Sequence, residues 1–181
     1  MLFTALALSG LYLVEPERVE DERGFFARTW CAAEARARGL VTPRAQAGVS
    51  FSKRRGTLRG LHYQEAPHAE VRLVRCTRGA IYDVVVDLRP DSPTYLRHVV
   101  TILSADSRAT LYVPEGCAHG FQTLEDATEV AYQMSRSYAP QAVRGVRWDD
   151  PRLAIAWPPA ERVIAERDRS WPDVVPARAA P

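Results

Sequence analysis

The sequence predicts a mainly β protein folded as an antiparallel sandwich or barrel, and three observations support this prediction. A chain of 181 residues with 46% hydrophobic residues can bury one substantial core, which favours a single domain over residues 1–181. Short runs rich in β-formers recur between turn signals, as is typical of such folds. Within the first two-thirds of the chain, only one short segment looks helical.

The elements can be expected in order along the chain. The apolar stretch from Leu2 to Val14 has no basic segment before it and runs into a charged turn, so it predicts a first β-strand rather than a signal peptide. The helical segment, Cys31 to Gly39, combines alanines and pairable charges with a glycine that can end the helix. The first strand is expected at 11–15 at the end of the apolar stretch, and further strands are expected at 24–30, 47–52, 57–64, 70–76, 80–88, 97–103, 109–114, 119–124 and 128–135.

The composition changes after Tyr138, where Pro, Arg, Asp and Trp become frequent. This change predicts a C-terminal arm over about residues 139–175 that packs on the barrel, followed by a frayed tail. No other apolar run approaches the roughly 20 residues needed to cross a bilayer, so we expect no membrane partner.

Charge and cysteine content narrow the functional classes. The formal net charge of +2 gives little support to a broad nucleic-acid-binding surface, although a local basic pocket for an acidic ligand remains open. The three cysteines, Cys31, Cys76 and Cys117, have no metal-ligand spacing. They favour reduced thiols in a cytoplasmic protein.

Two histidine-containing segments carry the first functional signal. Gly56 followed by His62, and Pro114-x-Gly116-x-x-His119, resemble the two motifs of cupins. That resemblance implies a cupin-type jelly roll (double-stranded β-helix) with few short helices, whose motif histidines often bind a metal. The usual His-x-His is replaced here by His62-Tyr63-Gln64, and an amide is a poor ligand for a transition metal. We therefore expect no metal, and a weak site formed by His62, His119 and Glu70 is the alternative.

Without a metal, His62 can act as a general base, because an imidazole side chain ordinarily exchanges its proton near neutral pH. A buried, hydrogen-bonded core histidine is the simpler alternative, but the same strand carries Arg59 and Gln64, which are costly to bury without a ligand. Strict alternation would put Arg59 and His62 on opposite faces of the strand. A β-bulge at Gly60 would turn both toward one cavity.

Six sequence blocks, taken together and in order, resemble the dTDP-4-dehydrorhamnose 3,5-epimerase family over nearly the whole chain. The blocks are DERGFF (21–26), GTLRGLHYQ (56–64), LVRCTRGAIYDVVVDLRPDSPTY (73–95), VPEGCAHGFQTL (113–124), WDDP (148–151) and ERDRSWP (166–172). The resemblance implies epimerisation of an NDP-4-keto-6-deoxyhexose through an enolate, without a cofactor. The absence of a GxGxxG segment between a strand and a helix agrees with this expectation.

The resemblance also implies the catalytic residues. His62 would be the base, Asp168 its partner, and Tyr132 the acid on the opposite face, since a phenol with a pKa around 10 can donate a proton. Arg72 occupies the position of a family lysine near the enolate oxygen, and its planar guanidinium is no point charge. Asp83, expected to be buried, is a plausible partner for Arg72.

The substrate-binding residues are likewise implied by the resemblance. Arginines suit bidentate contacts with a diphosphate. The expected ligands are Arg23, Arg59 and His119 at the diphosphate, Phe26, Gln46, Ser50 and Tyr138 near the base, ribose or sugar, and Gln64 beside the base histidine. This chain departs from the family at Arg28 and Gly48, near the nucleotide.

Several alternatives remain open at this level. The expected substrate is dTDP-4-dehydro-6-deoxyglucose, with CDP- or GDP-linked sugars as alternatives, and the reaction occurs at C3 and C5 or at only one of them. A metal-dependent cupin oxygenase or isomerase and a non-catalytic nucleotide-sugar-binding cupin are the competing functions. The resemblance further implies a homodimer built through N-terminal strands, which fits an apolar first segment with an edge that can pair.

Overall fold

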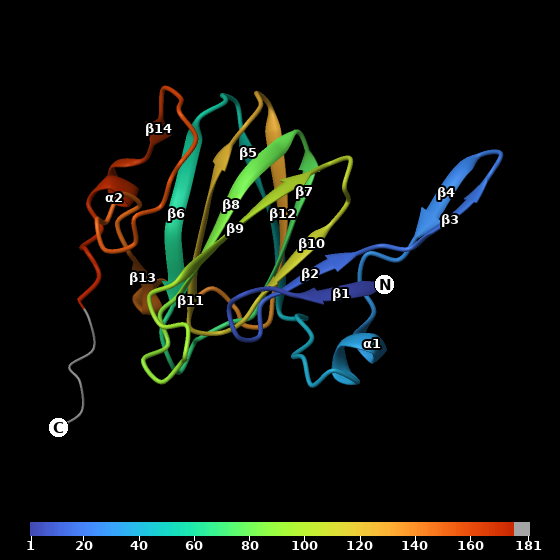
Figure 1. Cartoon of the computed structure of the whole chain (residues 1–181), viewed down its shortest axis with the longest axis horizontal. Coiled ribbons are helices and arrows are strands. Elements are labelled where there is room, and N and C mark those ends of the chain that lie inside the picture. The colour runs from blue at the N-terminus through green and yellow to red at the C-terminus, as the bar shows by residue number, and fades with distance from the viewer. Residues whose placement is uncertain (176–181) are drawn as a thin grey trace.

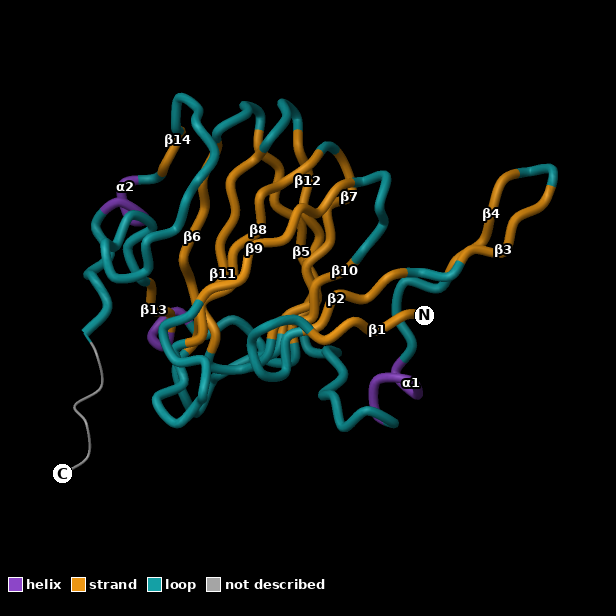
Figure 2. Tube along the Cα trace, in the orientation of Figure 1, coloured by secondary structure: helices purple, strands orange, loops and turns teal. Residues whose placement is uncertain are grey.

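Two antiparallel β-sheets form the body of the protein, and each contributes strands to a shared core (Figures 1 and 2). The computed structural model describes residues 1–175. In spatial order, the first sheet contains β1 (Leu2–Ala5), β2 (Tyr12–Glu15), β10 (Thr110–Val113), β7 (Arg72–Arg78), β12 (Thr128–Met134) and β5 (Gln46–Ser52). The second contains β13 (Val143–Gly145), β6 (Thr57–Gln64), β11 (Cys117–Thr123), β8 (Ala80–Asp87) and β9 (His98–Ser104), and β14 (Val163–Ile164) pairs with β6 in parallel.

The remaining elements are short. A separate hairpin contains β3 (Arg18–Asp21) and β4 (Gly24–Ala27), and the helical segments are α1 (Ala32–Arg36), a 3-10 turn (Pro140–Ala142) and α2 (Glu166–Arg169). The prediction of a mainly β fold with few short helices is therefore confirmed.

The central strand β8 is buried on both faces, which explains its nearly continuous apolar sequence. Ile81 and Val85 pack into the core between the sheets, together with side chains from β7, β10, β11 and β12. Val84 and Val86 point the other way, because successive side chains of a strand alternate. They pack against the C-terminal arm, including Trp157.

The arm, residues 139–175, runs along the outer side of β6. Its β13 continues the sheet next to β6, and β14 pairs with the other end of the same strand. Figure 1 shows α2 lying beside β6 between these two contacts. The predicted frayed tail, residues 176–181, lies outside the described residues.

The N-terminal segment differs from its prediction. Residues 2–14 form two strands, β1 and β2, because Gly10 (φ 79°) turns the chain back and Leu8 and Leu11 bury their side chains in the core. β1 is an edge strand, with β2 as its neighbour in the sheet. The β3–β4 hairpin extends away from the body (Figure 1), and Val19 and Phe26 on it are largely exposed.

The three cysteines are free thiols. The cytoplasmic location that they favoured stays a prediction. Within residues 1–175, no helix has the length and apolar character needed to span a membrane.

A β-bulge interrupts the pairing of β6 with β11. Arg59 is opposite Phe121 and His62 is opposite His119, so two residues of β6 face one residue of β11 between these pairs. Gly60 adopts φ 135°, a conformation that favours glycine, and it lies against Gly120. The predicted bulge at Gly60 is confirmed.

Gly120→Ala should destabilise the fold by about 1–3 kcal/mol, the usual cost of overpacking a core. A Cβ at Gly120 would lie 2.7 Å from the carbonyl oxygen of Arg59 and 2.9 Å from the Cα of Gly60. Gly48→Ala is the matched control, because its Cβ would meet no atom within 4 Å, and its effect should stay within about 0.5 kcal/mol. The check is urea unfolding of both variants, and equal stabilities would contradict the packing argument.

Candidate active site

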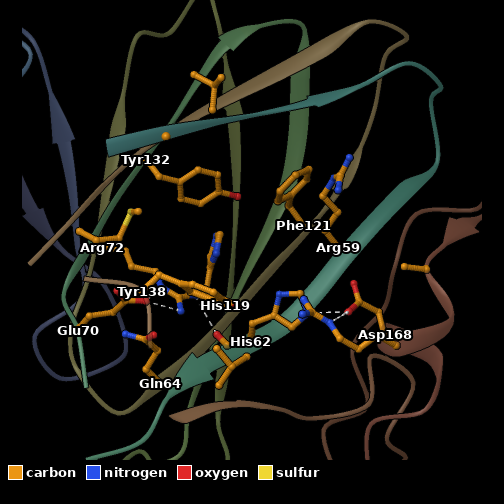
Figure 3. A pocket seen from close by; sticks show the side chains of 16 residues that line it. Arg59, His62, Gln64, Glu70, Arg72, His119, Phe121, Tyr132, Tyr138 and Asp168 are labelled. Carbon is orange, nitrogen blue, oxygen red and sulfur yellow. Dashed lines mark hydrogen bonds and ion pairs between the residues drawn. The ribbon is translucent and has the colours of Figure 1, made fainter. Parts of the chain in front are cut away.

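A cavity of ≈ 440 Å³ opens between the two sheets and the C-terminal arm (Figure 3). It gathers charged and aromatic side chains from strands of both sheets and from α2. The lining residues are Gly48, Val49, Arg59, His62, Gln64, Glu70, Arg72, His119, Phe121, Tyr132, Met134, Tyr138, Val143, Ala165, Arg167 and Asp168.

His62 of β6 is paired with Asp168 of α2. The Nε2 of His62 lies 2.7 Å from Oδ1 of Asp168, and the two side chains are 22% and 5% exposed. A neutral imidazole that donates its Nε2–H to this carboxylate has its lone pair on Nδ1. The pair can thus accept a proton at Nδ1 and stabilise the resulting imidazolium.

The bulge at Gly60 positions the His62–Asp168 pair in two ways. It places Arg59 and His62 opposite Phe121 and His119, which are two residues apart and share one face of β11, so both β6 side chains face the cavity. The backbone N–H of Gly60 also donates to Oδ2 of Asp168 at 3.2 Å. The backbone irregularity therefore positions both the histidine and its carboxylate.

The Asp168 carboxyl titrates below its usual range. Burial alone would raise the pKa of Asp168, but the hydrogen bond and charge of His62, the Gly60 amide and the nearby Arg167 together lower it. The carboxylate is consequently ionised wherever His62 can act as a base.

Tyr132 of β12 approaches the cavity from the opposite sheet (Figure 3). Desolvation and the charge of Asp83 raise the pKa of its phenol, and Arg72 and Arg59 offset only part of that rise. The phenol therefore keeps its proton at neutral pH and can serve as a donor. Its ring packs edge-on against His119, with the centroids 6.1 Å apart.

The predicted pairing of Asp83 with Arg72 is wrong. Oδ2 of Asp83 lies 2.7 Å from Nε2 of His119, and both residues are buried. Arg72 instead pairs with Glu70, at 2.7 Å between Nη2 and Oε1. Glu70 precedes β7 and reaches the guanidinium from two residues away. Asp83 lies on β8 opposite Phe121 of the neighbouring strand β11, so it reaches His119 diagonally across the two strands. His119, expected at the diphosphate, lines the cavity with Nε2 turned to Asp83.

The predicted substrate ligands near the mouth divide into two groups. Tyr138 and Gln64 line the cavity, but the amide of Gln64 is used by backbone groups: it accepts from the N–H of Ala139 at 2.7 Å and donates to the carbonyl of His68 at 3.0 Å. Gln46 accepts a hydrogen bond from the N–H of Tyr138. Gln46 and Ser50 lie on the same strand as Gly48, yet neither is among the lining residues.

Arg23 and Phe26 are not brought to the cavity of their own chain. Both lie on the extended β3–β4 hairpin, where Arg23 pairs with Asp21 and its side chain is 84% exposed. Their assignment as substrate ligands stays a prediction.

Sequence reasoning missed Phe121 and Arg167, which line the cavity, and Trp171, which contacts His62. Phe121 stands two residues after His119 and shares its strand face, so alternation could have found it. Arg167 precedes Asp168 and lines the cavity. Trp171, in the same block, packs edge-on against His62, with centroids 6.2 Å apart, and no periodic signal marked it.

The weak metal site considered from sequence does not assemble. His62 and His119 are directly opposite each other, but each faces a different carboxylate, and Glu70 is paired with Arg72. Within residues 1–175, no group of three or more His, Cys, Asp or Glu side chains is arranged to hold a metal ion.

The body is a jelly roll of the cupin type, and its inward face presents a histidine–carboxylate pair and a partly buried phenol, groups that can accept and donate protons. A sequence model of dTDP-4-dehydrorhamnose 3,5-epimerase matches residues 5–175. The chain belongs to the dTDP-4-dehydrorhamnose 3,5-epimerase family of isomerases, and the predicted family and cupin fold are confirmed.

Individual relatives agree over nearly the full length. A dTDP-4-dehydrorhamnose 3,5-epimerase of Sinorhizobium fredii is 41% identical over 96% of this chain and 90% of its own. A dTDP-4-dehydrorhamnose 3-epimerase of Streptomyces niveus is 38% identical over 93% and 82% of the two chains. The crystal structure of the Bacillus anthracis 3,5-epimerase, with TDP and pyrophosphate bound, superposes with a TM-score of 0.90 at 40% identity, covering 96% and 99%.

Asp168→Asn should flatten the loss of stability in acid. Because the pKa of Asp168 is lowered in the folded protein, its carboxylate stabilises the fold above the ordinary aspartate value of about 3.9, and this stabilisation is lost as the pH falls through the folded-state value. An amide has no such dependence. Urea unfolding from neutral pH down to about pH 2.5 should show a steeper decline for the wild type than for the variant; parallel curves would contradict the assignment.

Proposed function

We propose that the protein epimerises a dTDP-4-keto-6-deoxyhexose at C3 and C5, or at C3 alone, by proton removal and return without a cofactor. The observation that carries this proposal is the placement of His62–Asp168 and Tyr132 on opposite walls of one cavity. Epimerisation needs a base on one face of the sugar ring and an acid on the other. The relatives named above support the sugar and its nucleotide.

The proton path follows from the two walls. Nδ1 of His62 removes the C3 proton, which is acidic because the C4 ketone accepts the electron pair as an enolate. Tyr132 then donates its phenolic proton to C3 from the opposite face. His62 returns its proton to solvent and Tyr132 regains one, so the cycle balances, and C5 on the other side of the ketone can react in the same way.

The cations of the cavity stabilise negative charge. Arg72 lines the same cavity as His62 and Tyr132. Its positive charge would stabilise the negative charge that develops on the C4 oxygen of the enolate. Arg59 also faces the cavity, where its Nη2 donates to the carbonyl of Phe51 at 3.1 Å. Its guanidinium suits the diphosphate of the nucleotide.

We further propose that two copies combine so that the β3–β4 hairpin of one reaches the cavity of the other. The hairpin extends from the body with exposed apolar side chains, and β1 leaves a sheet edge open to pairing. In this arrangement Arg23 and Phe26 would contact the substrate in the cavity of the partner copy, because they do not reach the cavity of their own chain.

His62→Ala should abolish proton exchange while leaving nucleotide binding largely intact. The test is NMR of deuterium incorporation from D₂O into dTDP-4-keto-6-deoxyglucose, with EDTA-treated protein. The wild type should label C3, with or without C5, and His62→Ala should exchange at least about 10²-fold more slowly. Calorimetry should show similar dTDP affinity for His62→Ala and weaker affinity for Arg59→Ala.

The controls separate the competing functions. Wild-type exchange that requires added metal would favour a metal-dependent cupin. dTDP binding with no exchange at either carbon would favour a non-catalytic binding protein. Normal exchange in His62→Ala would remove the base assignment.

Mixed dimers should test the exchanged hairpin. Arg23→Ala and His62→Ala each impair a site, but a heterodimer of the two would contain one site with both native residues. Co-expressed chains should therefore recover roughly a quarter of wild-type activity at low substrate concentration, because half of randomly assembled dimers are mixed. Activity no higher than the average of the two variants would show that Arg23 does not act across the subunits.

A further inference from the structure

An ion pair is built into the wall of the cavity beside the proposed base. Nε of Arg72 donates to Oε1 of Glu70 at 2.8 Å, and Nη2 lies 2.7 Å from the same oxygen. Nη1 donates to the backbone carbonyl of His62 at 3.0 Å. The side chains of Arg72 and Glu70 are 14% and 8% exposed. The guanidinium is thus held from two sides, by Glu70 and by the strand that carries His62.

Within residues 1–175, some hydrogen-bond donors of Arg72 have no acceptor in this arrangement. A guanidinium has five N–H groups. Those of Nε and Nη1 bond to Glu70 and to the His62 carbonyl, and one edge of Nη2 is in ion-pair contact with the same Glu70 oxygen. One N–H remains on each terminal nitrogen, and among the residues that the structure describes neither has an acceptor. Since Arg72 lines the cavity together with Tyr132, two directed donors are available to a ligand there.

A second Glu–Arg pair, between Glu65 and Arg144 of β13, gives a useful contrast. Glu65 and Arg144 are also bonded, but their side chains are 45% and 43% exposed and neither lines the cavity. Exposed pairs of this kind contribute little and leave both side chains solvated. The Glu70–Arg72 pair is desolvated, so its geometry is more strongly enforced.

We propose that Glu70 is a positioning residue for the epimerisation, holding the planar guanidinium of Arg72 so that its two remaining N–H groups face the C4 oxygen of the sugar. This inference rests on the proposed function. Without Glu70, the long side chain of Arg72 would regain rotamers in which those donors point elsewhere. Glu70 acts through hydrogen-bond geometry, and its negative charge on its own would oppose the enolate.

The conservative variant distinguishes geometry from charge. Glu70→Ala should lower kcat for deuterium exchange by about 10- to 100-fold, somewhat less than the loss of a whole oxyanion donor. Glu70→Gln keeps an oxygen acceptor at the same position and should restore kcat to within a few-fold of the wild type. The affinity for dTDP, which lacks the sugar, should change in neither. Glu65→Ala is the matched control and should exchange at the wild-type rate.

Combining variants tests whether Glu70 acts through Arg72. In the Arg72→Lys background, Glu70→Ala should cost little further activity, because an ammonium has no planar fork to orient. Equal losses in both backgrounds, or equal losses for Glu70→Ala and Glu70→Gln, would overturn the proposal.

A measurement without substrate keeps this inference separate from the proposed function. In ¹⁵N-arginine-labelled protein, the Nη signals of Arg72 should be resolved by slow rotation about the Nε–Cζ and Cζ–Nη bonds, and should merge in Glu70→Ala. Rapid rotation in the wild type would refute the clamp even if the enzyme is active. A held guanidinium in a wild type that does not exchange this sugar would instead count against the proposed function.

Discussion

The extra residue in β6 at Gly60 is the constraint on which the site depends. Two glycines face each other here, and a Cβ at Gly60 would lie 2.5 Å from the Cα of Gly120. Because neither residue has a side chain, the two strands approach closely and the pairing register can shift. The shift turns Arg59 into the cavity beside His62 and frees the Gly60 amide to bind Asp168. One local irregularity thus links a cation, a base and the carboxylate of the base.

The C-terminal arm brings Asp168 and Trp171 into contact with His62. His62 and Asp168 are 106 positions apart in the chain, and they meet because β13 and β14 hold the arm along β6. The indole of Trp171 occupies the space over Gly145, where a Cβ would lie 2.3 Å from the ring, and it also packs against His62. The position of Asp168 next to His62 therefore depends on tertiary packing of the arm against β6 and on no local sequence signal.

Three buried or partly buried polar pairs lie at the cavity, and each pair contains one carboxylate. His62 pairs with Asp168, His119 with Asp83 and Arg72 with Glu70. Each cationic or titratable group has its own carboxylate, which limits the cost of desolvating it. Burial, and to a lesser extent the charge of Asp83, raise the pKa of Tyr132, so its phenol stays protonated at neutral pH. The same cavity therefore holds an imidazole paired with a carboxylate on one wall and a protonated phenol on the other.

The sequence by itself determined the fold class, the strands of the body and the family, because alternation, turn residues and ordered motif blocks are local signals. The family resemblance pointed to His62, Asp168 and Tyr132, which line one cavity, and their catalytic roles stay predictions. The bulge was predicted because two polar side chains on one strand, Arg59 and His62, needed a common cavity. Sequence reasoning failed for Asp83 and did not recognise the Glu70–Arg72 pair, because the choice of a charged partner depends on which strands become neighbours. Only the tertiary structure decided that β11 brings His119 to Asp83, that Trp171 covers His62, and that Arg23 and Phe26 lie away from their own cavity. Those outcomes follow from the packing of segments that are distant in the sequence, and no local sequence pattern predicts that packing.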